Sequence, residues 1–203
     1  MKQKTGRKLL SFLLTLAMVL GLVPGMSLTA LAAKADDQTG NCGDNVNYKL
    51  EDTDGDGKYD KLSISGTGAM TDYDAKNNTS PWKNSSENIK TIIIENGVTS
   101  IGNHAFRYCE GLTSVSIPGS VTTIGDSAFL NCKGLTNVSI PVGVTSIGEE
   151  AFWWCSGLTS VSIPNSVTNI KNGAFTSCQG LTNVTLPDSV KNLVQMYSII
   201  VSA

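Results

Sequence analysis

Histidine is almost absent from this sequence, and charged residues are scarce. The 203 residues include a single histidine, His104, and only 16% of them are Asp, Glu, Lys or Arg. A Ser-His-Asp or Cys-His arrangement needs a histidine base, and neither the phosphate-binding pattern GxxxxGK[ST] nor the zinc-protease pattern HExxH occurs. Nothing in the spacing of the carboxylates selects an acid-base pair of the glycosidase type. The sequence therefore predicts a protein that is not an enzyme.

The N-terminus has the pattern of a secretory signal peptide. Basic residues come first, an apolar run follows at 9–23, and the small residues Ala30 and Ala32 then offer a cleavage site after Ala32. The apolar run is about 15 residues long, whereas a membrane span needs about 20. We expect residues 1–32 to be a signal peptide and the protein to be secreted or associated with the cell surface; an uncleaved anchor is the alternative.

Removal of residues 1–32 makes the chain distinctly acidic. The four basic residues of that segment are lost, which leaves 11 Lys and Arg against 17 Asp and Glu. No basic patch remains, so nucleic acid and anionic membranes are excluded as predicted partners. Residues 33–88 carry 11 acidic and 6 basic residues, whereas residues 89–203 carry 6 and 5. This step in composition predicts two physically different parts.

A repeat of 23 residues organises the second part. The chain runs "LTSVSIPGSVTTIGDSAFLNCKG" from residue 112, "LTNVSIPVGVTSIGEEAFWWCSG" from 135 and "LTSVSIPNSVTNIKNGAFTSCQG" from 158. A looser copy begins at 89 and an incomplete one at 181. Internal periods of this length are typical of solenoids.

The apolar residues within one unit predict its conformation. Leu112, Val115 and Ile117 indicate a short strand with serines on its other face, because side chains alternate along a strand. A second extended piece precedes Gly125, and the Ala-Phe-x-x-Cys segment then predicts a short helical turn. The inward residues of one unit, about eight of them, gain about 1.5–3 kcal/mol each on burial. Ordering the backbone costs about 1–2 kcal/mol for each of the 23 residues of the unit. The cost exceeds the gain, so a single unit is unstable and the units must stack into a solenoid.

The spacing Leu-x-x-Val-x-Ile-Pro, Val-Thr-x-Ile-Gly and Ala-Phe-x-x-Cys resembles the leucine-rich repeats of the BspA type, also called the Treponema pallidum type. "GNCGDNVNYKL", "LSISGTGAMTDY" and "SPWKN" resemble the β-rich segment that precedes such repeats. The resemblance implies a β-rich N-terminal cap within 33–88, repeats over 89–192 and a secreted or surface protein, bacterial, non-enzymatic, that binds proteins or mediates adhesion. Residues 193–203 depart from the pattern and form an irregular C-terminal tail.

Four cysteines recur in one position of the repeat, and Cys42 stands apart. In a secreted chain cysteines usually form disulfides, and stacked coils would bring equivalent residues within bridging distance. Their side chains should nevertheless point in parallel into the core, so we favour buried free thiols over bridges. The four positions are Cys109, Cys132, Cys155 and Cys178.

The acidic stretch "DTDGDGKYD" offers a candidate calcium site. Asp52, Asp54, Asp56 and Asp60 occupy positions 1, 3, 5 and 9 of an EF-hand-like loop, with Gly57 at its sharp turn. The twelfth position, which should be a bidentate Glu, is Ser63. The alternative is a solvated hairpin turn without an ion, and in either case the loop would only stiffen the cap.

The residues between Phe and Cys in the repeat are the candidate binding residues. We call them the aromatic strip: Arg107, Tyr108, Leu130, Trp153 and Trp154. Phe and Cys face inward, so the pair between them should face outward, and the next coil uses Thr and Ser there instead. Aromatic residues with Arg nearby are the usual anchors of binding surfaces. The strip predicts a host or cell-surface protein as partner; a glycan-binding module and a purely structural surface module are the alternatives.

Overall fold

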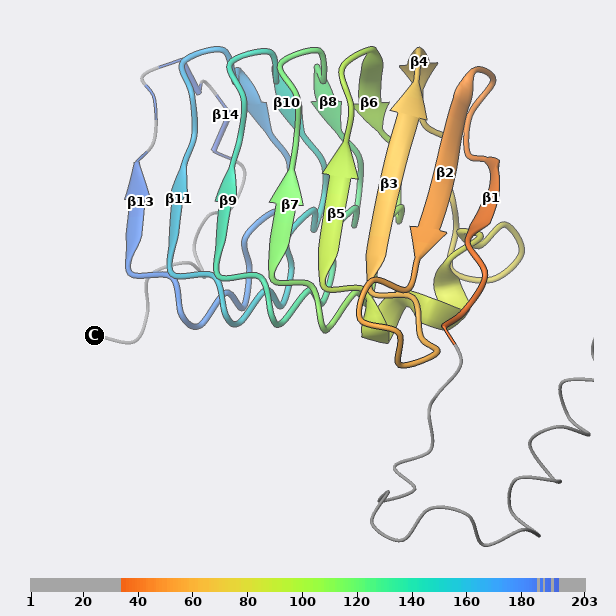
Figure 1. Ribbon diagram of the computed structural model, residues 1–203. Coiled ribbons are helices and arrows are strands. Elements are labelled where there is room, and N and C mark those ends of the chain that lie inside the picture. Colours follow the sequence, from red (N-terminus) through yellow and green to blue (C-terminus); the bar gives the residue numbers. More distant parts are fainter. Residues whose placement is uncertain (1–33, 186, 188, 191, 194–203) are drawn as a thin grey trace, which may run out of the picture. The chain divides into compact units, whose positions relative to one another are not determined.

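The chain winds into a stack of similar coils, as the 23-residue period predicts (Figure 1). The computed structural model describes residues 34–185, 187, 189–190 and 192–193. The expected signal peptide at 1–32 and the tail beyond residue 193 lie outside these described residues. The units that begin at 89, 112, 135 and 158 each supply a front strand, a second short strand and a segment of turns, and the described part of the unit at 181 supplies the two strands. The prediction of a β-rich repeat solenoid is confirmed.

The front strands follow one another in parallel along the stack. They are β5 (Thr91–Ile94), β7 (Ser114–Ser116), β9 (Asn137–Ser139), β11 (Ser160–Ser162) and β13 (Asn183–Thr185). Residues 23 apart pair with each other, as in Val138 with Val161 and Val161 with Val184. The front strands form two sheets, because β5 pairs with β7, β9 pairs with β11, and no ladder joins β7 to β9.

The second set of short strands forms a continuous six-stranded sheet behind the first (Figure 1). Its members are β4 (Gly68–Ala69), β6 (Val98–Ile101), β8 (Thr123–Ile124), β10 (Ser146–Ile147), β12 (Asn169–Ile170) and β14 (Asn192–Leu193). The isoleucine in each of β6, β8, β10 and β12 is buried, and the preceding residue is partly exposed. The threonine before this pair bonds the coil before it, as when the Thr145 hydroxyl donates to the Thr122 carbonyl at 3.2 Å.

The Ala-Phe-x-x-Cys segment forms a run of turns and no helix. Its amides alternate between two acceptors: Phe106 N–H donates to Ala128 of the next coil at 2.8 Å, whereas Arg107 N–H donates to His104 at 3.4 Å. The alternation requires residues with positive φ, and these include His104 at 54° and Tyr108 at 62°. The predicted helical turn is therefore replaced by single turns, because every second amide bonds the neighbouring coil.

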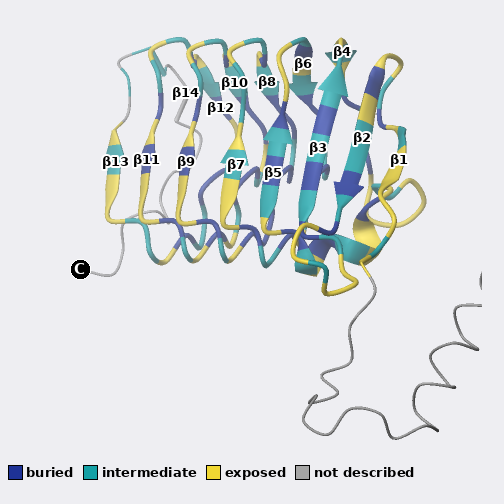
Figure 2. Ribbon diagram, viewed as in Figure 1, coloured by how far each residue is buried: buried dark blue, intermediate teal, exposed yellow. Residues whose placement is uncertain are grey.

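One buried phenylalanine from each coil forms a column through the core. Rings of consecutive coils lie 5.1–5.2 Å apart between centroids, and Phe152 is nearly parallel to Phe129 and Phe175, at 5° and 2°. Trp82 extends the column, stacked at 5.8 Å on Phe106, and its indole N–H donates to the Ala105 carbonyl at 2.8 Å. Figure 2 shows the burial of the inward positions along the whole stack.

The four repeat cysteines form a second buried column. All are free, and each of the last three donates its thiol hydrogen to the Phe carbonyl of the preceding coil, as from Cys132 Sγ to Phe106 at 3.3 Å. Burial raises the pKa of the Cys109 thiol to about 12. The position therefore selects a small residue that fills core volume and also satisfies one carbonyl of the turn.

An antiparallel pair of strands and an irregular coil close the N-terminal end. β1 (Gln38–Asn41) pairs with β2 (Val46–Glu51), and β2 pairs with β3 (Lys61–Gly66). β3 then runs parallel to β5, so the stack of parallel front strands begins before the first repeat identified in the sequence. The 3-10 helix η1 (Lys83–Asn88) leads from Trp82 into β5.

Glycines occur where neighbouring coils approach most closely. A Cβ at Gly125 would lie 2.6 Å from the Asn103 amide nitrogen, and one at Gly148 would lie 2.5 Å from that of Asp126. At these contacts the Asp126 backbone N–H donates to Asn103 Oδ1 at 2.7 Å, and the Glu149 backbone N–H donates to Asp126 Oδ1 at 2.8 Å. The Gly of the motif is thus required by the backbone contact between coils.

Candidate binding surface

The aromatic strip lies on the turn side of the coils. Tyr108, Asn131, Trp154 and Ser177 occupy the same repeat position in consecutive coils, with φ of 62°, 63°, 60° and 61°. Equal backbone angles in stacked coils direct their Cα–Cβ bonds the same way. Left-handed backbone favours Gly and Asn and is unusual for bulky side chains. The fold itself therefore does not account for Tyr and Trp at this position.

Tyr108 and Arg107 form one end of the strip. The Tyr108 side chain is 41% exposed. The Arg107 guanidinium carbon lies 4.4 Å from the centre of the tyrosine ring, and an Arg107 Nη donates to the Tyr108 hydroxyl oxygen at 2.8 Å. The guanidinium is held over the ring by this cation–π contact, while its buried Nε has no hydrogen-bond partner.

Trp153 and Trp154 form the other end. Their rings stack on each other, with centroids 5.1 Å apart and planes at 21°. Trp154 is 49% exposed, and Trp153 is partly buried. Tyr108, Val142 and Trp154 are the exposed large hydrophobic residues in the described part of the chain, and two of these three share one repeat position.

Buried residues separate the two ends. Leu130, which the sequence places in the exposed strip, is only 5% exposed, because it lies in the stack between the larger Arg107 and Trp153. Asn131 is 4% exposed; its Nδ2 donates to Glu110 Oε1 at 2.7 Å, and its Oδ1 is buried without a partner. Sequence reasoning did not assign Asn131 or Glu110 to the site, although Asn131 shares its repeat position with Tyr108 and Trp154.

His104 lies near this surface, one turn before Arg107. Its Nδ1 is buried without a hydrogen-bond partner. Burial and the positive charge of Arg107 lower the pKa of the His104 imidazole, and the carboxylates of Asp126, Asp74 and Glu150 oppose this only in part. Among the described residues, the only group that could hold a metal ion is Asp52, Asp54 and Asp56, which does not include His104. The relation of His104 to the strip is electrostatic, through the charge of Arg107.

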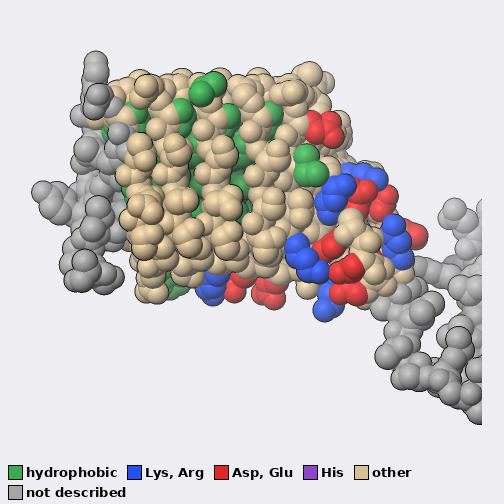
Figure 3. All heavy atoms as spheres, turned by 60° about the vertical axis from the view of Figure 1, so that its left-hand side comes forward, with side chains coloured by type: hydrophobic (Ala, Val, Ile, Leu, Met, Phe, Trp, Pro, Cys, Tyr) green, Lys and Arg blue, Asp and Glu red, His purple; other side chains and the backbone are tan. Residues whose placement is uncertain are grey.

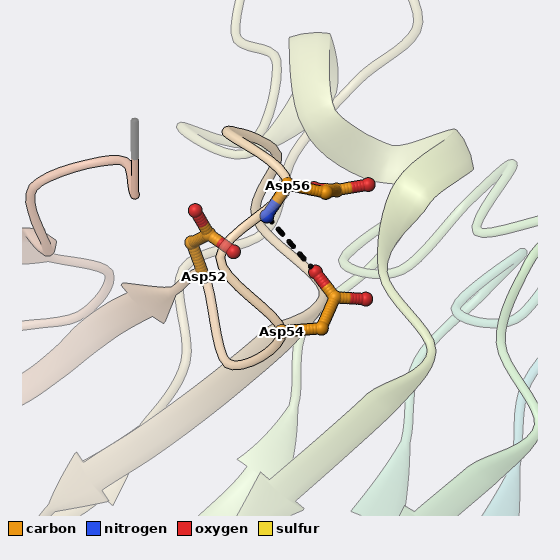
Figure 4. A group of neighbouring side chains, drawn as sticks. All are labelled: Asp52, Asp54 and Asp56. Atoms are coloured by element: carbon orange, nitrogen blue, oxygen red, sulfur yellow. Dashed lines mark hydrogen bonds between the residues drawn. The ribbon is translucent and has the colours of Figure 1, made fainter. Parts of the chain in front are cut away.

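The acidic loop brings three of its four predicted ligands together. Carboxylate oxygens of Asp52, Asp54 and Asp56 lie within 4.8 Å of one another (Figure 4). Asp52 is buried, and its oxygens accept the amides of Ala35, Gly55 and Gly57 at 2.7–3.0 Å. Burial raises the pKa of Asp52, but these amide donors outweigh it and leave the pKa lowered. Asp52 therefore anchors the loop whether or not an ion binds.

The other loop carboxylates have partners of their own. The Lys90 ammonium lies 2.9 Å from Asp54 and lowers the pKa of that carboxyl. Asp60 is turned toward Thr53, accepting its amide at 2.8 Å and its hydroxyl at 2.7 Å, and is not part of the three-carboxylate group. A calcium ion would therefore have to use Asp52, Asp54 and Asp56 and compete with Lys90.

The front strands present an uncharged polar face. Alternate residues of β7, β9, β11 and β13 are exposed, and all of these are Ser, Thr or Asn. Charged side chains gather instead toward the N-terminal cap and along the lower edge of the view in Figure 3. Several are paired with one another in the cap, as Lys49 with Asp37 and Glu51 at 3.0 and 2.9 Å.

The same structural features recur in the coils that begin at 112, 135 and 158: a buried phenylalanine, a buried cysteine and a front strand with an exposed polar face. Such recurrence is typical of a repeat protein family. The BspA type leucine-rich repeat region matches residues 80–197, with six copies. The chain belongs to the BspA-type leucine-rich repeat family. Members of this family are typically non-catalytic. No curated protein matched the sequence.

Solved structures of other bacterial leucine-rich repeat proteins share the fold. A leucine-rich repeat protein of Eubacterium ventriosum is 28% identical, with a TM-score of 0.59 over 78% of this chain and 46% of its own. A leucine-rich repeat protein of Bacteroides ovatus is 28% identical, with a TM-score of 0.51 over 73% and 41%. A leucine-rich cell surface protein of Faecalibacterium prausnitzii is 27% identical, with a TM-score of 0.55 over 70% and 38%. The chain thus spans less than half the length of these three structures.

The relatives and the described coils agree on a leucine-rich repeat scaffold. One of the three structures is described as a cell surface protein. Among the residues that the structure describes, no helix is both long and apolar enough to cross a membrane.

Proposed function

We propose that this BspA-type protein is secreted or displayed at the cell surface, has no enzymatic activity, and binds a partner protein through the aromatic strip. The observation that carries the proposal is the exposure of Tyr108 and Trp154 at one repeat position, 41% and 49%. A coil of the same fold is built with Ser177 at that position. Exposed aromatic residues that the scaffold does not need are the usual anchors of protein interfaces.

Backbone conformation supports the same conclusion. The fold gives this repeat position a left-handed φ in all four coils, and such a φ costs non-glycine residues of order 1–3 kcal/mol. Tyr108 and Trp154 keep φ of 62° and 60° although Asn or Gly would adopt them more easily. The fold therefore does not explain bulky aromatic residues at this position, which supports a role for them in binding.

A pull-down from host cell-surface proteins tests the proposal. The purified chain is compared with the double variant Trp153→Thr, Trp154→Ser, which gives this coil the Thr176–Ser177 pair of the next one and should fold normally. The control is Val142→Ser, which removes an exposed hydrophobic residue, 80% exposed, at a different repeat position. We expect the double variant to lose the captured protein and the control to keep it.

Two results would contradict the proposal. Capture that survives the double variant would remove the strip as the binding surface. A glycan array on which the chain binds sugars through the same tryptophans, with no protein captured, would replace the protein partner by a carbohydrate.

A further inference from the structure

Within the strip, Tyr108, Asn131 and Trp154 form what we call the two-ring site. Two exposed rings at one repeat position flank a residue that is buried. Neighbouring coils lie about 5 Å apart, as the ring spacings of Phe106, Phe129 and Phe152 show. Tyr108 and Trp154 are two coils apart, so their attachment points are separated by roughly 10 Å along the solenoid axis.

We propose that the two-ring site binds a proline-rich segment in the polyproline II conformation, lying along the solenoid axis. This inference rests on the proposed function and specifies the partner. A polyproline II helix has three residues per turn and rises about 3.1 Å per residue, so residues three apart lie about 9 Å apart on one face. Prolines at i and i+3 would then contact the rings of Tyr108 and Trp154, while the two residues between them face away from Asn131.

The spacing disfavours an extended strand, and an α-helix of suitable spacing would place an additional side chain between the two rings. An extended strand places residues on one face about 6–7 Å apart, which is between one and two coil spacings. An α-helix places i and i+7 about 10.5 Å apart, but it also presents i+3 or i+4 between them. That intermediate side chain would meet Asn131, whose Oδ1 is buried without a partner and whose Nδ2 already donates to Glu110.

Hydrogen-bond donors at the site match what such a segment offers. Polyproline II has no internal hydrogen bonds, so its carbonyls remain free acceptors. The Tyr108 oxygen accepts from Arg107, which leaves the tyrosine hydroxyl hydrogen available to donate. Trp154 carries an indole N–H two coils away. Aromatic faces combined with such donors are how known polyproline-binding grooves work, and the preformed conformation lowers the entropy cost of binding.

Binding of a fluorescent decaproline peptide to the full chain, measured by anisotropy, tests the proposal. We expect saturable binding that Tyr108→Ser and Trp154→Ser each weaken about tenfold or more, the loss typical of an anchor residue. Val142→Ser should bind like the unmodified chain. A flexible Gly-Ser peptide of equal length, which has no polyproline II preference, should not bind.

A second variant tests the spacing itself. Trp154→Ser combined with Ser177→Trp keeps the number of aromatic residues but moves the second ring from two coils to three coils away from Tyr108. Ser177 has the same φ as Trp154, 61° against 60°, so the new ring leaves the backbone in the same direction. We expect this variant to bind decaproline as weakly as Trp154→Ser alone, with an unchanged melting temperature.

Three outcomes would overturn the inference. They are no saturable binding of decaproline, equal binding of the Gly-Ser peptide, and full binding by the variant with the displaced tryptophan. If the chain captures a protein in a Trp154-dependent way yet fails these tests, the proposed function stands and the polyproline partner is rejected. If neither protein capture nor decaproline binding depends on Trp154, both fail.

Discussion

Replacing Phe152 by alanine should remove a large part of the stability of this protein. Phe152 is fully buried and packs between Phe129 and Phe175, at 5.1 and 5.2 Å, in nearly parallel stacks. Phe-to-Ala changes in a core cost about 3–5 kcal/mol, since apolar burial is lost and a cavity remains. Domains of this size are stable by about 5–15 kcal/mol, so the variant should lose at least about a fifth of its unfolding free energy.

Urea unfolding followed by far-UV circular dichroism measures this loss. Val142→Ser is the matched control, because Val142 is 80% exposed and should change the midpoint very little. The m value must be similar in all variants for the comparison to hold. A loss below about 1 kcal/mol for Phe152→Ala would refute the continuous column.

A double-mutant cycle separates stacking from burial. Leucine at 129 and 152 together should show a coupling of about 0.5–1.5 kcal/mol, because adjacent aromatic rings interact beyond their buried area. Leucine at 106 and 152 should show additive effects, because Phe129 lies between these two rings and coupling in repeat proteins is mainly between nearest neighbours. Equal coupling in the two cycles would contradict the nearest-neighbour structure of the stack.

Three further predictions follow from individual side chains. All five cysteines should react with a thiol reagent only after denaturation, because the thiols are buried and burial raises the pKa of Cys42, Cys109 and Cys178 to about 12; fewer than five thiols in denaturant would reveal a disulfide. Because the pKa of His104 is lowered in the folded state, its stabilising contribution is complete above its unfolded pKa of about 6.5 and is lost as the pH falls through the folded pKa; His104→Asn should flatten the stability–pH curve there, and an unchanged slope would exclude the effect. If Asp52, Asp54 and Asp56 hold calcium, melting temperature should rise with calcium relative to chelator, Asp54→Asn should abolish the rise and Asp44→Asn should retain it; identical melts with and without calcium would leave a plain turn.

The repeat made much of the fold accessible to sequence reasoning. The 23-residue period identifies which residues are equivalent, and the alternation in "LTSVSI" identifies which of them face inward. Phe129 and Cys132 could be assigned to the core on this basis, and both are fully buried. The period also places Tyr108 and Trp154 at one repeat position, so both could be predicted as candidate binding residues from the sequence alone.

The details of the site depended on neighbours that the pattern does not specify. Leu130 and Asn131 occupy outward positions in the motif, yet larger residues in the adjacent coils leave them 5% and 4% exposed. Asp60 has the correct spacing for a loop ligand, but a hydroxyl and an amide of Thr53 bind it instead. Trp82 has no counterpart in the repeat units quoted above, and only stacking on Phe106 shows that it ends the column.

The sequence by itself determined the period, the inward residues and the solenoid, because each follows from local alternation of apolar side chains repeated at a fixed interval. Only the tertiary structure decided which outward side chains are exposed, that the Ala-Phe-x-x-Cys segment bonds between coils, and that the front strands divide between β7 and β9. These features depend on contacts between residues about 23 positions apart, and the depth of a side chain there is set by the size of whatever lies in the next coil.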